Sequence, residues 1–165
     1  MDAPAPRIER LRRGDRIVLA THNAGKLREF RELFAPTGIE IVSAGELGLP
    51  EPEETGTTFI ENARIKAHAA AQASGMIALA DDSGLCVDAL GGQPGVYTAN
   101  WAEGPMGRDY MRGMKRVEDA LNAAGAADPS ERRGSFRATL CLAHPDGRDD
   151  IYEGAAHGTL VWPPR

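Results

Sequence analysis

Short apolar runs alternate along this chain with segments whose apolar residues recur at helical spacing. Residues 16–20 (RIVLA) predict a strand that is followed by a helix. One apolar face of that helix is formed by Leu27, Phe30, Leu33 and Phe34. Gly38 ends the helix, and residues 39–42 predict the next strand. These elements together predict a βαβ unit.

A second helix precedes what we expect to be the central strand. Thr58 and Glu61 have the spacing of a capping box. The alanine-rich sequence after them predicts a helix that Gly75 ends. Residues 76–80 (MIALA) then have the length and character of a strand that is buried on both faces.

The second half of the chain predicts one more helix and several strands. Helical spacing links Tyr110, Met114, Val117 and Leu121, and Gly125 ends this helix. Alternating apolar residues predict a half-buried strand at 135–143, and a turn at 145–147 predicts a hairpin with residues 150–152. Another strand is expected at 158–162. The pattern as a whole is that of an α/β protein.

Composition narrows the class of protein. The 165 residues fit one domain, which we place at residues 16–165 after a disordered arm at residues 1–15. The net charge of −5 without a basic run argues against a nucleic-acid partner, and no apolar segment is long enough to cross a membrane. The charged N-terminus does not resemble a signal peptide. Cys86 and Cys141 lie in apolar contexts, which predicts reduced core residues of a cytoplasmic protein.

Two carboxylates, Asp81 and Asp82, follow the central strand directly. Ionised groups at the end of a buried strand are costly unless they are paired, hydrogen-bonded or bound to a cation. Because side chains alternate along an extended segment, one aspartate should face a cleft and the other should anchor the loop. An acidic loop with an Asx turn is an equally good interpretation of these residues alone. A glycine-rich turn at residues 91–95 follows.

Residues 21–26 (THNAGK) lie at a strand-to-helix junction, where backbone N–H groups and the helix dipole favour an anion. Lys26 adds a positive charge. The motif is not a Walker A loop, because Leu27 stands where Ser or Thr is required. If this motif is considered alone, the simpler interpretation is a structural turn with a surface lysine.

Asn62 and Lys66 are four residues apart on the second predicted helix, so both are expected to project outward from one face. A solvated helix face is the simpler interpretation of this pair alone. The histidines have no metal-ligand spacing, and we expect each to be a surface or internally satisfied residue: His22, His68, His144 and His157.

The carboxylates and lysines together indicate a function that none of them indicates alone. Glu53 and Glu54 precede a helix whose N-terminus does not require two acidic residues. Asp81 and Asp82 end a buried strand, in which charged residues are unfavourable. Hard oxygen ligands beside lysines near helix starts are what a magnesium–polyphosphate site requires.

Three motifs in this order resemble the inosine triphosphate pyrophosphatase family, which hydrolyses non-canonical purine nucleoside triphosphates. They are Thr21-x-Asn23-x-Gly25-Lys26, the stretch from Glu53 to Ala63 with Lys66, and Asp81-Asp82-Ser83-Gly84-Leu85 with the Gly-Gly-x-Pro-Gly turn. The resemblance covers nearly all of residues 16–165. It implies a mixed, twisted sheet flanked by helices, in two lobes with a nucleotide cleft between them.

The resemblance also implies roles for individual residues. The loop that holds the triphosphate would consist of Thr21, His22, Asn23, Ala24, Gly25 and Lys26. Lys66 and Ser83 would contact the substrate, and Glu54 would bind Mg²⁺, a role that fits Glu53 less well. Asp82 would be both a metal ligand and the base for the attacking water.

The implied reaction cleaves ITP, dITP or XTP between the α- and β-phosphates and releases a nucleoside monophosphate and pyrophosphate. The implied partners are the nucleotide, the Mg²⁺ cofactor and a second copy of the chain in a homodimer.

The sequence departs from the family pattern in two places. Asn100 stands where the family usually has arginine, and the family's base-recognition segments, Gly-Phe-Gly-Tyr-Asp-Pro and Ser-His-Arg, do not follow the final Pro-Pro-Arg. We therefore expect a C-terminally incomplete domain. An inactive nucleotide-binding or dimerising protein with the same fold is the main alternative. A third alternative is an aspartate-based phosphotransfer module. It would need an acceptor aspartate on a later strand, and this sequence has no suitable one.

Overall fold

The computed structural model describes residues 10–165, so most of the predicted N-terminal arm lies outside the described residues. The chain divides into two compact units. The first contains the described residues up to Asp81 together with Thr139–Tyr152, and the second contains Asp82–Ala138 and Glu153–Arg165.

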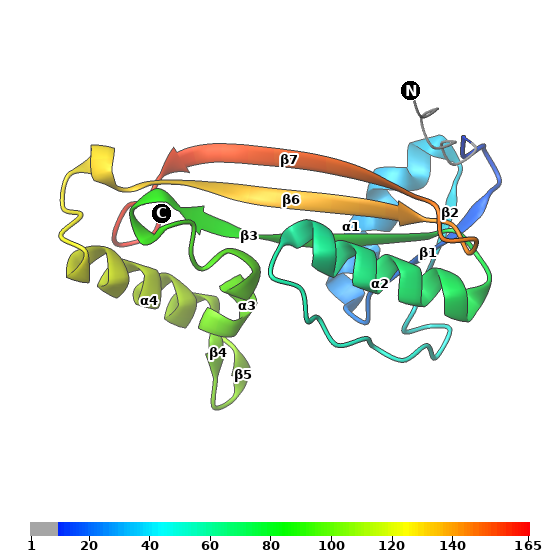
Figure 1. Ribbon diagram of the computed structural model, residues 1–165, viewed down its shortest axis with the longest axis horizontal. Helices are drawn as coiled ribbons and strands as arrows, with labels where there is room; N and C mark the ends of the chain where they lie inside the picture. Colours follow the sequence, from blue (N-terminus) through cyan, green and yellow to red (C-terminus); the bar gives the residue numbers. More distant parts are fainter. Residues whose placement is uncertain (1–9) are drawn as a thin grey trace, which may run out of the picture. The chain divides into compact units, whose positions relative to one another are not determined.

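Helices and strands alternate along the first part of the chain, and two pairs of consecutive strands follow (Figure 1). In chain order they are β1 (Arg16–Leu19), α1 (Ala24–Phe34), β2 (Glu40–Ser43), α2 (Phe59–Ser74), β3 (Ala78–Val87), α3 (Thr98–Trp101), β4 (Glu103–Gly104), β5 (Gly107–Arg108), α4 (Tyr110–Ala123), β6 (Arg133–Ala143) and β7 (Asp149–Thr159). The strand order in the main sheet of the described chain is β2-β1-β3-β6-β7, and β4 pairs with β5 in a separate antiparallel ribbon. The predicted α/β class with a mixed sheet is confirmed.

The first unit is built on parallel strands with a helix on each face. In β1, Val18 pairs with Val42 of β2, and Leu19 pairs with Leu79 of β3. Phe30 of α1 packs in an apolar cluster with Ile17, Leu19, Ile41 and Leu79. The alanines of α2 pack in a second cluster with Val18, Val42, Ala78 and Ala80. Because successive strand residues face opposite ways, the two helices cover opposite faces of these strands.

The ends of α2 follow from its sequence. Thr58 accepts a hydrogen bond from the Glu61 N–H at 3.1 Å, which is the first half of the predicted capping box. Glu61 accepts instead from the N–H of Thr57 at 2.8 Å, one residue before the expected donor. Gly75 ends the helix with a φ of +70°, a conformation that glycine adopts without strain.

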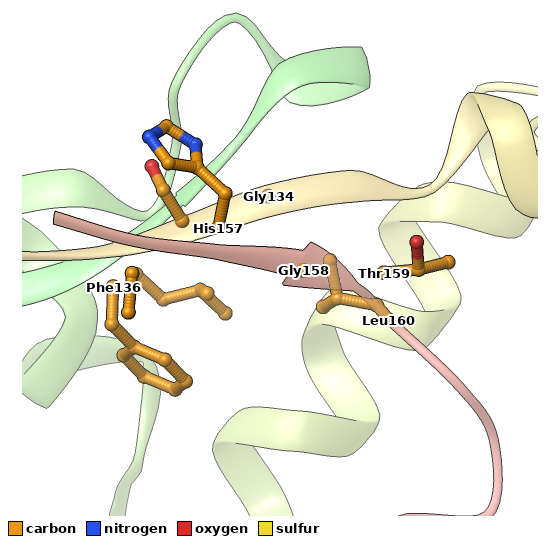
Figure 2. Close-up of a pocket in the computed structure, with 9 residues that line it drawn as sticks. Gly134, Phe136, His157, Gly158, Thr159 and Leu160 are labelled. Carbon is orange, nitrogen blue, oxygen red and sulfur yellow. The ribbon is translucent and has the colours of Figure 1, made fainter.

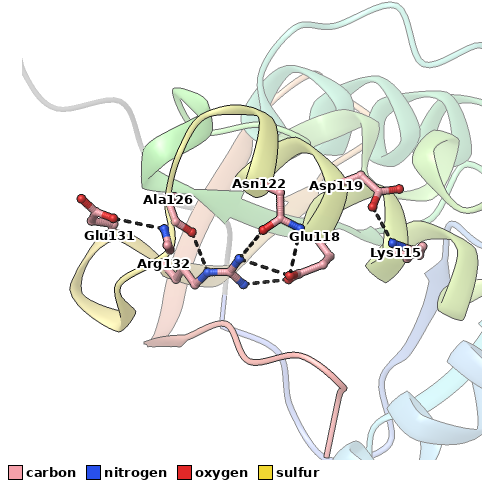
Figure 3. Close-up of polar contacts among 8 residues, drawn as sticks. Lys115, Glu118, Asp119, Asn122, Ala126, Glu131 and Arg132 are labelled. Carbon is pink, nitrogen blue, oxygen red and sulfur yellow. Dashed lines mark hydrogen bonds and ion pairs between the residues drawn. The ribbon is translucent and has the colours of Figure 1, made fainter.

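In the second unit, a buried arginine joins the start of β6 to α4 (Figure 3). Arg132 donates to Glu118 at 2.7 and 3.1 Å, to Asn122 at 3.0 Å and to the carbonyl of Ala126 at 2.7 Å. Hydrogen bonds from Arg132 hold the pKa of Glu118 below its usual range. All three guanidinium nitrogens of Arg132 therefore have at least one acceptor.

Two strand predictions were wrong in their extent. The central strand does not end at Ala80, because β3 continues through the two aspartates to Val87. The two strands predicted after the hairpin turn are one strand, β7, from Asp149 to Thr159. Polar and glycine residues resemble turns in the sequence, whereas pairing with neighbouring strands keeps them extended in the fold.

Candidate functional site

The loop between β1 and α1 is organised by Asn23. Its side-chain oxygen accepts hydrogen bonds from the N–H groups of Gly25 at 2.8 Å and Lys26 at 3.1 Å, and so caps α1. Thr21 Oγ1 accepts from the Asn23 N–H at 3.1 Å. The Asn23 oxygen thus holds two amides that were expected to face an anion, and its side-chain NH₂ group is the donor of this residue that a ligand can use.

Two lysines meet at Asp81. Lys26 Nζ lies 2.8 Å from Asp81 Oδ2, and Lys66 Nζ donates to the Asp81 carbonyl oxygen at 2.5 Å. Lys66 also lies 3.0 Å from Glu54 Oε1. The chain has only three lysines. Two of them, Lys26 and Lys66, are far apart in sequence but both contact Asp81.

This cluster lies at the carboxyl end of β1, beside the point where the parallel pairing of β1 with β3 stops. The loop with Lys26 follows β1, and Asp81 comes two residues after Leu79, which pairs with the last residue of β1. Ligands of open α/β sheets bind at this edge. The cluster therefore lies where ligands bind in sheets of this kind.

The acidic loop that carries Glu54 is held by α2. The N–H of Gly56 donates to the side-chain oxygen of Asn62 at 2.8 Å, and Asn62 is only 4% exposed. An added Cβ at Gly56 would lie 2.6 Å from that oxygen and 2.6 Å from Cβ of Glu61. Only glycine lets the loop approach the helix this closely.

The expectation that Asn62 projects outward beside Lys66 was wrong. The Asn62 side chain is buried and satisfies a backbone donor of the loop, whereas Lys66 reaches the carboxylate of Glu54. A small hollow of about 30 Å³ lies beside Lys66, with His22 and residues 50–52 of the acidic loop in its lining. The sequence signal for the role of Asn62 was the glycine six residues before it, which marks a close backbone approach.

Asp82 and Ser83 follow Asp81 directly in β3 and belong to the second unit. Asp82 is partly buried, with its Oδ2 atom shielded from solvent, and Ser83 is exposed. The structure thus brings Lys26, Lys66 and Glu54 together around Asp81. Sequence reasoning missed the role of Asp81 itself, since neither a lysine partner nor the use of its carbonyl oxygen has a local signature.

The charges of the cluster can exchange partners with a ligand. Each lysine is paired with a carboxylate or carbonyl oxygen, and the side chain of Glu54 is 46% exposed. A divalent cation prefers carboxylate oxygens, and phosphate oxygens prefer ammonium groups. A cation–polyphosphate complex would replace each internal ion pair by two matched ones, so these residues fit such a ligand.

The second unit contains a different kind of cavity (Figure 2). It measures about 190 Å³ and is lined by Leu85, Gly134, Ser135, Phe136, Ala156, His157, Gly158, Thr159 and Leu160. This lining offers one imidazole and two hydroxyl groups but no carboxylate or ammonium group. It therefore lacks the charges that a metal–polyphosphate ligand needs.

Residues 17–165 match the sequence model of the Ham1 family. The chain belongs to the Ham1 family. The family resemblance predicted from the three motifs is thereby confirmed. None of the helices described for residues 10–165 is both long and apolar enough to cross a membrane.

Two dITP/XTP pyrophosphatases and one solved structure are similar to this Ham1 chain over most of its length. A dITP/XTP pyrophosphatase of Mesorhizobium japonicum is 63% identical over 153 residues, which are 92% of this chain and 70% of the relative. A dITP/XTP pyrophosphatase of Ruegeria pomeroyi is 57% identical, over 92% of this chain and 74% of its own. The structure of a HAM1 protein from Coxiella burnetii superposes with a TM-score of 0.81 and 38% identity, over 92% of this chain and 75% of that one.

Proposed function

We propose that this Ham1 protein is a Mg²⁺-dependent pyrophosphatase of non-canonical purine nucleoside triphosphates such as ITP, dITP and XTP. It hydrolyses the bond between the α- and β-phosphates and releases a nucleoside monophosphate and pyrophosphate. The observation that carries the proposal is the meeting of Lys26, Lys66 and Glu54 around Asp81, beside the carboxyl end of β1. The dITP/XTP pyrophosphatases among its relatives support the choice of substrate.

The residues divide into phosphate-binding and proton-transferring groups. Residues Thr21 to Lys26 and Lys66 bind the triphosphate, because ammonium groups neutralise its charge and the amide of Asn23 can donate to it. Ser83, the next exposed residue of β3, contacts the substrate through its hydroxyl group. These contacts hold the α-phosphate in place for attack by water.

Glu54 and Asp82 would hold the cation, which supplies Lewis-acid stabilisation of the phosphate oxygens when it is bound. Asp82 also accepts the proton of the attacking water. A carboxylate in this role contributes about 10²–10⁴ in rate. Neighbouring side chains alternate along an extended strand, so Asp81 and Asp82 can serve different partners.

The test is pyrophosphate release by the 165-residue chain from dITP and XTP, with dATP as the comparison. We expect nucleoside monophosphate and pyrophosphate in equal amounts, dependence on Mg²⁺, and loss of turnover with EDTA. Release of inorganic phosphate and nucleoside diphosphate would contradict the proposed bond cleavage. Nucleotide-induced stabilisation without any turnover would favour the alternative of an inactive nucleotide-binding protein.

The homodimer implied by the family resemblance and the cytoplasmic location inferred from the reduced cysteines remain predictions. Light scattering coupled to size-exclusion chromatography measures the first, and we expect twice the mass of the 17.6 kDa chain.

A further inference from the structure

A second group of metal-ligating side chains lies within the first unit, on three different elements. His68 is on α2, Cys141 is on β6 and Asp149 is the first residue of β7. One ligand atom of each residue lies within 4.8 Å of those of the other two. The three ligand types and the wide sequence separation of His68 distinguish this group from a local acidic cluster.

The carboxylate of this group is held in place by the helix beside it. Asp149 Oδ2 lies 2.7 Å from His68 Nε2. Arg64, one turn before His68 on α2, donates to the two oxygens of Asp149 at 3.0 and 3.3 Å. Carboxylates that bind metals are commonly oriented by such an outer hydrogen bond.

The thiol of the group is enclosed by the core. Cys141 is 0% exposed and packs among the alanines of α2, including Ala67, Ala70 and Ala71. Burial raises the pKa of the Cys141 thiol to about 12, and the charge of Asp149 adds to this effect. Burial also acts to raise the pKa of Asp149, but hydrogen bonds from His68 and Arg64 outweigh it and lower that pKa.

We propose that His68, Cys141 and Asp149 form a binding site for one thiophilic divalent cation of the Zn²⁺ class. A thiolate, an imidazole nitrogen and a carboxylate oxygen are the ligands that Zn²⁺ takes in proteins. Three protein ligands leave a fourth position for water. The hard carboxylate and phosphate ligands proposed for Mg²⁺ at Glu54 and Asp82 make a chemically different site.

Zinc binding needs a local adjustment of the three side chains. Tetrahedral bonds of about 2.0–2.3 Å to zinc put ligand atoms about 3.3–3.8 Å apart. The three atoms lie within 4.8 Å of one another, so the widest pair must close by up to about 1.5 Å, and the 2.7 Å contact of His68 with Asp149 must open by about half an ångström. The cation takes the place of the hydrogen between Nε2 and Oδ2. A neutral imidazole that binds a metal through Nε2 carries its one hydrogen on Nδ1, so the hydrogen displaced from Nε2 is matched by one on Nδ1 and the net proton released to solvent is that of the Cys141 thiol.

A cation at this position would join α2 to β6 and β7 within the first unit. Lys66 precedes His68 by two residues on α2, so the same metal would stabilise the helix that carries a phosphate-binding lysine. The expected consequence is a higher melting temperature at saturating Zn²⁺, because a ligand that binds only the folded state stabilises it.

The test uses Co²⁺ as a spectroscopic probe on the 165-residue chain, with Mg²⁺ in excess to occupy the site of hard ligands. We expect a thiolate-to-cobalt charge-transfer band that saturates at one equivalent and disappears when Zn²⁺ is added. Cys141→Ala should abolish the band, and His68→Gln should weaken Co²⁺ binding by at least about a hundredfold.

Two matched controls come from the chain itself. Cys86→Ala removes the other cysteine, and His144→Gln removes a histidine that pairs with Asp146 at 3.3 Å. Both should leave the band and the stoichiometry unchanged. If Cys141→Ala does not fold, as judged by circular dichroism, His68→Gln decides, since its side chain is partly exposed. The absence of a thiolate band in the parent chain would overturn the proposal. So would a band that survives in Cys141→Ala or in His68→Gln with unchanged affinity, or one that is lost in Cys86→Ala.

Discussion

Lys66 is the residue through which most of the proposed site is connected. Its ammonium group contacts the carboxylate of Glu54 and the carbonyl oxygen of Asp81, and Asp81 in turn holds Lys26. The Lys66 side chain is 20% exposed, so its charge is partly desolvated. A cation in such a position interacts more strongly with a phosphate than one in open water.

Lys66→Met should lower kcat/KM for dITP by about a hundredfold, because one of the groups that stabilise the phosphate charge in the transition state is lost. Steady-state pyrophosphate release measures this change. Lys115→Met is the matched control, since Lys115 is the third lysine of the chain and contacts Asp119 on the exposed surface of α4 and the ring of Trp162 rather than any residue of the proposed site. Equal activity of the two variants would remove Lys66 from the site.

Gly56→Ala should destabilise the fold by about 1–3 kcal/mol, because the new methyl group overlaps atoms that cannot all move aside. The clash is with Asn62 Oδ1 and Glu61 Cβ, at 2.6 Å each. Denaturant unfolding measures the free energy, and activity should fall as well, since Glu54 is in the same loop. Gly154→Ala is the control, because nothing lies within 4 Å of a Cβ added there. Equal stability of both variants would contradict the close packing of the loop.

At the scale of elements, periodicity was a good guide where one face of an element is apolar. The helices α1, α2 and α4 and the strands β1 and β2 lie where their patterns predicted them. The extension of β3 through Asp81–Gly84 could not be predicted, because these residues favour turns locally and are kept extended by pairing along the sheet. Long-range contacts set β7 in the same way.

The same limit applies to the site. The motifs indicated which lysines and carboxylates belong together, because spacing at strand ends is visible in a sequence. The contact of Lys66 with a backbone oxygen and the meeting of His68 with Cys141 and Asp149 were not visible, since they depend on how distant elements pack. His68 has no metal-ligand spacing along the chain, because Cys141 and Asp149 come from two other elements.

Thr58→Ala should destabilise the protein by about 1 kcal/mol, because the cap of α2 satisfies a backbone N–H that would otherwise lack a partner in the helix. Thermal or denaturant unfolding gives the difference. Thr57→Ala, at the exposed neighbouring residue, should change the free energy of unfolding by less than about 0.5 kcal/mol. A larger effect of Thr57→Ala than of Thr58→Ala would show that Thr58 is not the residue that caps α2.

At the scale of the whole molecule, stability also depends on charged pairs that are not part of the proposed site. Arg132 and Glu118 are the best-buried charged pair among the described residues, with side chains 11% and 12% exposed. Since Arg132 lowers the pKa of Glu118, ionised Glu118 stabilises the folded state. This contribution is complete above the unfolded pKa of about 4.3 and is lost as pH falls through the lower folded pKa.

Glu118→Gln should therefore lower the melting temperature by several degrees at pH 7, and the difference from the parent chain should shrink as pH falls below about 4. Thermal unfolding across this range measures it. Asp119→Asn removes the exposed pair with Lys115 (Figure 3) and should have little effect at any pH. A difference for Glu118→Gln that stays constant down to pH 2 would show that charge is not its cause.

The division between the two compact units falls between Asp81 and Asp82, the two carboxylates at the centre of the functional proposal. Their neighbouring positions give them separate tasks: Asp81 holds Lys26, and Asp82 is proposed to take the proton from water. The most direct measurement is kcat for pyrophosphate release from dITP by Asp82→Asn, together with nucleotide binding by the same variant. We predict a loss of about 10²–10⁴ in kcat with nucleotide still bound and the fold intact. Turnover at the rate of the parent chain would contradict the account.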